Sequence, residues 1–307
     1  MINEMILPSR IDGLGISVLV VRPEDKPKAV IQLAHGVCGC KERFMPMMEY
    51  MAGKGVACVA GDHRGHGFSV KSQEDLGYMY EGGYMALVDD MRVITEWIHD
   101  TFPAAPVYLV GHSMGSMAAR IYAKYDDSAI DGLILTGSPS WNPFSVVGKM
   151  LSGFMCGIGL SHYRMSLVQR MTSFRYNRHF ASEGRQAWTC SDPQVRQSFS
   201  DNPRCDFFLT ANGSYNLMCM MGETYSDDRW VVSNPSLPIF FISGTDDPTM
   251  GSEKKFHEAA QNICDRGYID VTSALYPGMR HEVLNEIGKE EVWDDILDFM
   301  GLRTSGR

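Results

Sequence analysis

Several features that would assign a chain of 307 residues to other protein classes are missing here. The N-terminal stretch MINEMILPSR is polar and acidic where a signal peptide carries basic residues, and no long apolar run follows it, so we expect a cytoplasmic protein. No uninterrupted apolar run is long enough to cross a bilayer. The net charge of −9 argues against a nucleic-acid partner, because phosphate binding requires a basic face.

Metal-binding and disulfide motifs are also scarce. The eight cysteines are scattered, only Cys38 and Cys40 lie close together, and neither C-x-x-C nor H-E-x-x-H occurs. We therefore expect reduced thiols, no metal and no cofactor. The spacing of His63 and His66 is weak evidence for a metal site. Cys38 and Cys40 could have a redox role, but we favour the interpretation that they are small buried residues that fill space.

Short apolar runs alternate with helical patterns along most of the chain. The runs 29–34, 56–60, 130–136, 239–243 and 269–275 are predicted strands, and 45–51, 85–98, 118–125, 253–263 and 290–300 are predicted helices. The first two strands lack a polar alternate, as expected for strands that are covered on both faces. The alternation predicts an α/β fold with a mostly parallel, doubly wound sheet.

Two segments depart from this alternation. Residues 5–22 contain two short alternating runs around Asp12-Gly13, which predicts a hairpin at a sheet edge. Residues 141–229 are rich in Met, Phe, Tyr and Arg and lack alternating strands. We interpret them as an inserted helical cap on a core formed by residues 1–140 and 230–307; an ordinary helical layer is the alternative.

The stretch PVYLVGHSMGS from Pro106 to Ser116 is the centre of the chemistry. It has strand character, then a tight turn with Ser113 between Gly111 and Gly115, then helical character. This is the G-x-S-x-G nucleophile elbow, in which small flanking residues allow the sharp turn that exposes the serine hydroxyl.

A serine nucleophile needs a base, and the base needs an acid that fixes its tautomer. The loop after strand 239–243 contains Asp246 and Asp247, and the loop after strand 269–275 contains His281. The order Ser, Asp, His is that of α/β-hydrolases. We predict the triad Ser113, Asp247 and His281, and prefer Asp247 to Asp246 because Pro248 holds its neighbour in an extended loop.

The same mechanism requires backbone N–H groups that stabilise an oxyanion. The N–H of Met114 follows from the elbow. The second donor is expected in the loop after strand 29–34, with the sequence HGVC, where Val37 is our candidate.

These motifs together resemble the monoglyceride lipase and lysophospholipase branch of the α/β-hydrolases, also labelled serine aminopeptidase-like. The matching segments are His35-Gly36, the loop GDHRGHG at 61–67, the elbow, Gly244-x-x-Asp247 and His281, and within the cap Tyr176-Asn177, Phe180, Arg185, Trp188 and Ser191-Asp192. The resemblance implies an α/β-hydrolase fold with a cap, a lipid ester substrate, and a structural role for the 61–67 loop. Ala187 departs from the pattern, where an acidic residue is expected.

The charge and the apolar residues of the cap indicate the class of substrate. Between residues 141 and 206 it has eight Lys and Arg against four Asp and Glu. A positive cap would favour anionic substrates or a transient contact with an anionic membrane surface, but we prefer the interpretation that these charges form a solvated helical face. The apolar run 150–160 is too short to span a membrane. We predict that it lines an acyl pocket, with Met150, Phe154, Met155 and Ile158 as the contact residues; the alternative is that it dips into a membrane interface.

The leading hypothesis is thus a serine hydrolase for the carboxylic ester of a monoacylglycerol or lysophospholipid. One alternative is an aminopeptidase, for which Glu183 or Glu223 could hold the free amine. A small-ester carboxylesterase and a ligand receptor that keeps the hydrolase fold are further alternatives. The sequence leaves the oligomeric state open.

Overall fold

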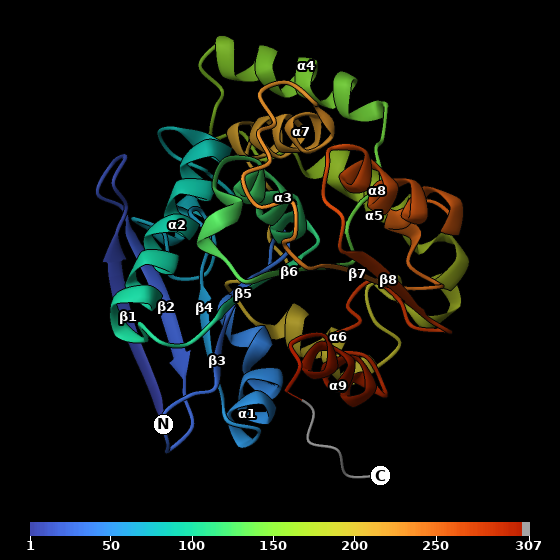
Figure 1. Cartoon of the computed structure of the whole chain (residues 1–307). Coiled ribbons are helices and arrows are strands. Elements are labelled where there is room, and N and C mark those ends of the chain that lie inside the picture. The colour runs from blue at the N-terminus through green and yellow to red at the C-terminus, as the bar shows by residue number, and fades with distance from the viewer. Residues whose placement is uncertain (303–307) are drawn as a thin grey trace.

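A single eight-stranded sheet organises the chain, and the structure, a computed structural model, describes residues 1–302 (Figure 1). Its strands are β1 (Ile2–Pro8), β2 (Gly15–Val21), β3 (Ala29–Ala34), β4 (Val56–Gly61), β5 (Val107–His112), β6 (Gly132–Thr136), β7 (Ile239–Gly244) and β8 (Val271–Tyr276). Their order is β1-β2-β4-β3-β5-β6-β7-β8. All pairs from β4 to β8 in this order are parallel, whereas β2 is antiparallel to both of its neighbours.

Helices cover both faces of the sheet, because the strands have apolar side chains on both faces. One face packs against α2 (Gly83–Thr101), α3 (Met114–Asp126) and α8 (Glu253–Asp265), and the other packs against α1 (Met45–Gly53) and α9 (Lys289–Phe299) (Figure 1). The predicted α/β-hydrolase fold and the edge hairpin are confirmed. The helix after the elbow begins at Met114, directly after Ser113.

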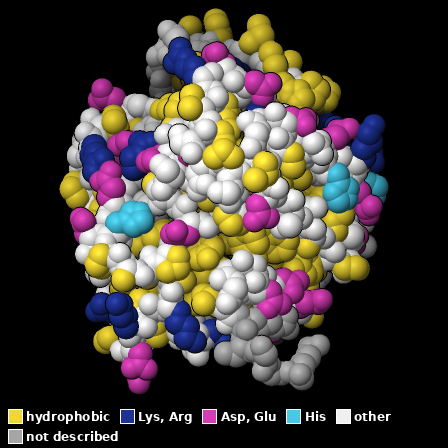
Figure 2. Space-filling view, in the orientation of Figure 1, with side chains coloured by type: hydrophobic (Ala, Val, Ile, Leu, Met, Phe, Trp, Pro, Cys, Tyr) yellow, Lys and Arg dark blue, Asp and Glu magenta, His cyan; other side chains and the backbone are white. Residues whose placement is uncertain are grey.

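Four α-helices lie between β6 and β7. They are α4 (Phe144–Gly157), α5 (Ser166–Asn177), α6 (Pro193–Asp201) and α7 (Ala211–Tyr225). α7 packs against α2 and α3, and α4 packs on α7. In the surface view, hydrophobic side chains gather along the upper edge, over α4 (Figure 2). The division into a core and a cap at residues 141 and 229 stays a prediction.

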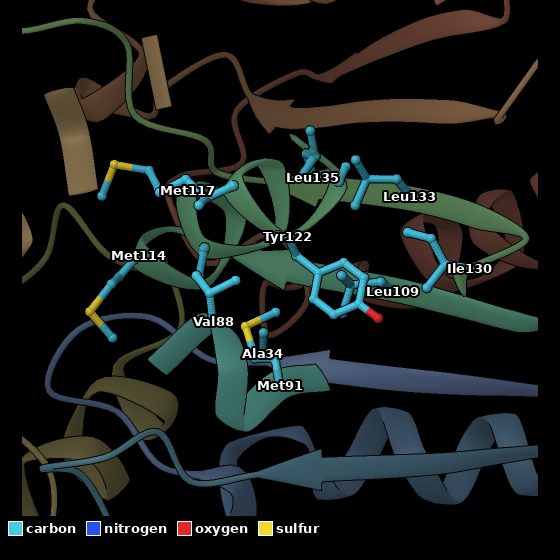
Figure 3. Close-up of a cluster of buried hydrophobic side chains, with 14 of the residues drawn as sticks. Ala34, Val88, Met91, Leu109, Met114, Met117, Tyr122, Ile130, Leu133 and Leu135 are labelled. Carbon is cyan, nitrogen blue, oxygen red and sulfur yellow. The ribbon is translucent and has the colours of Figure 1, made fainter. Parts of the chain in front are cut away.

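Alternating residues of the central strands enter the two halves of the core. On the α2 and α3 side, Leu109 of β5 and Leu133 of β6 pack with Met91 and Tyr122 (Figure 3). Val110 and Ile134, their neighbours in sequence, enter the opposite half with residues of α1 and α9. The core thus fixes the central strands from both sides, and with them the loops at their carboxyl ends.

Candidate active site

Ser113 occupies a sharp turn between β5 and α3. Its φ of 53° lies in a region that residues other than glycine rarely adopt. A Cβ at Gly115 would lie 2.1 Å from the carbonyl oxygen of Ala34, and one at Gly111 would lie 2.4 Å from that of Gly115. Only glycine fits these close approaches, which explains both flanking positions of the elbow.

The three residues predicted as a triad form one hydrogen-bonded chain. His281 Nε2 lies 2.9 Å from Ser113 Oγ, and His281 Nδ1 lies 3.0 Å from Asp247 Oδ2. All three side chains are buried, with 7% or less of each residue exposed. The serine comes from the end of β5, the aspartate follows β7 and the histidine follows β8, so the sheet edge brings them together.

The aspartate in contact with the histidine is Asp247. Its backbone is extended, as Pro248 predicts, and its Oδ1 accepts a hydrogen bond from the Thr249 N–H at 2.8 Å. Ser243 Oγ donates to Oδ2 at 3.2 Å. Asp246 is exposed, and its Oδ1 accepts only from the adjacent Thr245 hydroxyl among the described side chains. The geometry therefore favours Asp247 as the partner of the histidine.

The aspartate and the histidine shift each other's pKa in opposite directions. Burial opposes ionisation of Asp247, but the charge of protonated His281 and the hydrogen bonds to the carboxylate outweigh it and lower the Asp247 pKa. Burial likewise disfavours the charged form of His281, yet the Asp247 charge and hydrogen bond raise the His281 pKa above its ordinary value. The negative charge of Glu282 acts in the same direction.

The predicted oxyanion donors flank the serine. Met114 is the first residue of α3, where an N–H has no partner within the helix, and Val37 lies in the loop after β3. Neither N–H donates a hydrogen bond to a described residue. Both residues line the same cavity as Ser113. This arrangement leaves two backbone donors at the serine, although their role as an oxyanion hole stays a prediction.

Four residues around the histidine were not assigned a role from sequence. The Trp188 ring lies 5.1 Å from the His281 ring at an interplanar angle of 35°, so a residue between α5 and α6 packs on the base. Arg43 forms an ion pair with the buried Glu282, which follows His281 in sequence. The His112 ring also packs on His281, with 4.8 Å between the ring centroids. Burial first, and then the His281 charge, lower the His112 pKa to about 3, so His112 is neutral.

A cavity of about 2180 Å³ extends from the serine beneath the helices between β6 and β7. Apolar residues of α4, α5 and α7, with Trp141, form much of its wall: Phe144, Val147, Leu151, Val168, Met171, Phe174, Leu217, Met218 and Met221. Typical small-molecule pockets measure about 300–1,000 Å³, so this cavity is large.

The predicted acyl-pocket residues do not line this cavity, and that prediction is corrected. Met150, Phe154 and Ile158 expose 71%, 64% and 54% of their surface, and Met155 is half-buried. The cavity is bordered instead by the neighbouring stripe of α4 that contains Val147 and Leu151. The helix carries apolar side chains on several faces, so its sequence does not mark the face that turns inward.

Neither carboxylate considered for amine binding lines the cavity. Glu183 pairs with Arg280 at 2.7 Å, and Glu223 pairs with Lys124 at 2.6 Å. Ala187, at the position that departs from the family pattern, is fully buried, and its carbonyl accepts a hydrogen bond from Arg280.

The histidines of the 61–67 loop pack with His35. The His35 ring lies 4.4 Å from that of His63 and 5.3 Å from that of His66. Burial lowers the pKa of His35 to about 4 and that of His66 to about 3. Within residues 1–302, no three His, Cys, Asp or Glu side chains are grouped as metal ligands.

The two cysteines at the loop after β3 are buried, as predicted. Cys38 and Cys40 expose 5% and 0% of their surface. Burial raises the Cys38 pKa, and a hydrogen bond with Cys205, followed by burial, raises that of Cys40. Both thiols are therefore protonated at neutral pH, in keeping with a packing role.

Known proteins share both the sequence pattern and the fold. The family model Hydrolase_4, described as serine aminopeptidase, S33, matches residues 25–288. A monoacylglycerol lipase of Mycolicibacterium smegmatis is 24% identical over 296 residues, which cover 94% of each chain. A thermostable carboxyl esterase from Bacillus coagulans, solved with glycerol, aligns with a TM-score of 0.87 at 24% identity over 98% of each chain. A monoglyceride lipase variant from Saccharomyces cerevisiae aligns with a TM-score of 0.77 at 18% identity, over 98% of this chain and 96% of that one.

Proposed function

The chain belongs to the serine aminopeptidase S33 family of α/β-hydrolases and is a carboxylic ester hydrolase, and from this premise we propose that it cleaves monoacylglycerol or lysophospholipid esters. Ser113 is the proposed nucleophile, His281 the base and Asp247 the acid that orients it. The observation that carries the proposal is the hydrogen-bonded Ser113–His281–Asp247 chain at a cavity of about 2180 Å³ with apolar walls.

In the first half of the proposed reaction, Ser113 Oγ attacks the ester carbonyl carbon while His281 Nε2 takes the hydroxyl proton. The new C–O bond places negative charge on the carbonyl oxygen, which the N–H groups of Val37 and Met114 stabilise. His281 then gives its proton to the departing alcohol oxygen as the ester bond breaks. The acyl group stays on Ser113, and the glycerol or glycerophospho alcohol leaves.

In the second half, a water molecule attacks the acyl carbon and gives a proton to His281. Collapse of the second tetrahedral intermediate releases the fatty acid, and the proton returns to Ser113 Oγ. Asp247 keeps the Nδ1 proton of His281 in place throughout, so that Nε2 faces the serine in the form that accepts a proton.

The aminopeptidase alternative has less support from the cavity. An aminopeptidase needs a carboxylate for the free amine of its substrate, and Glu183 and Glu223 are engaged in ion pairs away from the cavity lining. A long acyl chain instead needs an extended apolar wall, and α4, α5 and α7 supply one.

Two measurements test the proposal. A fluorophosphonate should label Ser113, as determined by peptide mass, and a substrate panel should cover glycerol and lysophosphatidylcholine esters from acetyl to stearoyl, with aminoacyl amides beside them. We expect kcat/KM to rise at least about 100-fold from acetyl to palmitoyl, because each buried methylene contributes up to about 0.8 kcal/mol. Preference for acetyl esters would indicate a small-ester esterase, turnover of the amides an aminopeptidase, and labelling without turnover a receptor.

A further inference from the structure

One cation in the core of the protein has no counter-charge. Within residues 1–302, four Lys or Arg residues expose 1% or less of their surface: Lys41, Arg64, Arg120 and Lys124. Three of them form ion pairs with carboxylates, namely Lys41 with Asp62, Arg64 with Asp12 and Asp90, and Lys124 with Glu223. Arg120 takes part in none of the ion pairs of the described chain. Because a guanidinium keeps its proton in proteins, this positive charge is buried without compensation.

The hydrogen bonds of Arg120 are also incomplete. A guanidinium has five N–H donors. Nη2 donates to Asn262 Oδ1 at 3.4 Å, a long hydrogen bond, and neither Nε nor Nη1 has an acceptor within residues 1–302. The ring centroids of Tyr225 and Phe241 lie 4.5 and 5.9 Å from the guanidinium carbon, so their faces attract the charge without accepting all of its N–H groups. We call these residues the Arg120 site: Arg120 of α3, Tyr225 of α7, Phe241 of β7 and Asn262 of α8.

The surroundings of the Arg120 site add positive charge. Arg266, the residue that follows α8, lies close enough to be affected: burial is the largest cause that lowers the Arg266 pKa, and the charge of Arg120 is the next. Arg266 has its own carboxylate partner, Asp227, at 3.0 Å. This carboxylate is mostly exposed and balances one of the two guanidinium groups. One buried positive charge therefore remains.

A set of donors around one uncompensated positive charge selects an anion. A water molecule could accept an N–H hydrogen bond here, but it would leave the buried charge unbalanced, and a divalent anion would overcompensate it. We propose that the Arg120 site binds one small monovalent inorganic anion of the size of chloride. Arg120 is not among the residues that line the cavity at Ser113, so this site is separate from the candidate active site and does not depend on the proposed hydrolysis.

Thermal melts in two salts test the anion. The full chain is melted in sodium chloride and in sodium gluconate at equal ionic strength, which makes general screening the same in both. Gluconate carries the same charge but is too large for a buried site. We expect Tm to be about 3 °C higher in chloride, as for an anion that binds only the folded state and is present at about ten times its dissociation constant. Equal Tm values in the two salts would overturn the inference.

Variants of the arginine test the location. Arg120→Met has a side chain of similar length without the charge, so the difference in Tm between the two salts should vanish. Arg120→Lys keeps the charge and should retain part of the difference. The matched control is Arg92→Met on α2, because Arg92 pairs with Asp89 and Asp126 and should not hold an anion. A chloride response in Arg120→Met as large as that of the wild type would contradict the assignment.

Bromide gives a direct test that requires no variant to fold. The wild-type protein is crystallised in sodium bromide, and data are collected at the bromine absorption edge. We expect an anomalous peak in contact with Nε and Nη1 of Arg120. Bromide at other positions only, or a water molecule on the guanidinium in its place, would refute the anion site. Both readouts, stability and diffraction, are independent of ester turnover, so the failure of this inference and the failure of the proposed function remain distinguishable.

Discussion

Helices α3 and α4 differ in how much of their apolar surface is buried. Of the 13 residues of α3, the 11 from Met114 to Lys124 are buried, whereas α4 buries only Ser145 and Ser152 of its 14 residues. Yet α4 carries more Val, Leu, Met and Phe side chains than α3. α3 lies between the sheet, α2 and α7, while α4 packs mainly on α7. What surrounds a helix, rather than its own hydrophobicity, decides what it buries.

The buried region around α3 and the exposed region around α4 should therefore affect hydrolysis differently. Around α3, buried hydrogen bonds hold Ser113, Asp247 and His281 in fixed geometry, and a change there should affect every ester substrate alike. Around α4 and α5, apolar side chains face the cavity rim and the exterior. The effect of a substitution there on activity should therefore depend on the acyl length of the substrate.

Ser113→Ala should produce the largest effect. Without the nucleophile, we expect kcat to fall about 10⁴- to 10⁶-fold for short and long esters equally. The loss of one oxygen should leave the melting temperature unchanged. Steady-state rates and thermal melts check this, with Ser198→Ala on the exposed surface of α6 as the control. Wild-type turnover by Ser113→Ala would refute the mechanism.

Asp247→Asn should have the second-largest effect. We expect kcat to fall about 10⁴-fold, because an amide at this position favours the wrong tautomer of His281. Asp246→Asn is the matched control, one residue away, and should retain almost full activity, since Asp246 is exposed. Both rates are compared with melts of both variants. If the folded Asp246→Asn lost more activity than Asp247→Asn, the acid would have to be reassigned.

The pH dependence should show a smaller effect. Ester hydrolysis needs neutral His281, whose pKa is raised, so kcat/KM should fall on the acid side with a midpoint above about 6.5. The contribution of His281 to folding stability changes with pH in the opposite direction. Because its pKa is higher in the folded protein, this contribution is fully present below the pKa of the unfolded state and is lost as the pH rises through the pKa of the folded state. Activity therefore increases over the pH range in which this contribution disappears.

Glu282→Gln sharpens this test, because the Glu282 charge helps to raise the His281 pKa. The acid limb should move to lower pH in this variant and stay in place in Glu290→Gln, whose side chain is exposed. An acid limb that shifts upward in Glu282→Gln would contradict the assignment of the limb to His281.

Much of the core was predictable because its signals are local and regular. The apolar run 29–34 matches β3 in full, since a strand covered on both faces is mostly apolar, here with Gln32 as its one polar residue. A parallel sheet brings the carboxyl ends of its strands to one edge, so residues as distant as Ser113 and His281 could be predicted to meet. The extended backbone at Asp247 followed from the neighbouring proline.

The contacts of the cap were not predictable in this way. Trp188 reaches His281 from an irregular segment without helical or strand periodicity, so no pattern in the sequence marks that contact. On α4, apolar residues surround much of the helix, and the choice between the inner stripe with Leu151 and the outer stripe with Phe154 depends on tertiary packing. Glu183 was a candidate for amine binding, and its ion pair with Arg280 was not predicted because Arg280 lies 97 residues away in the sequence.

The smallest expected effect comes from Leu151→Asp and Phe154→Asp, which place the same charge three residues apart on α4. Leu151 lines the cavity and Phe154 does not. If the cavity holds the acyl chain, Leu151→Asp should flatten the rise of log kcat/KM with chain length, because each methylene beside the charge loses up to about 0.8 kcal/mol. Phe154→Asp should keep the wild-type slope when the esters are monomeric and no vesicles are present.

Short esters should be hydrolysed normally by both variants, since Ser113, His281 and Asp247 are untouched. The slope for a series of soluble esters is the measurement, and equal slopes for the two folded variants would mean that the inner stripe of α4 does not contact the acyl chain.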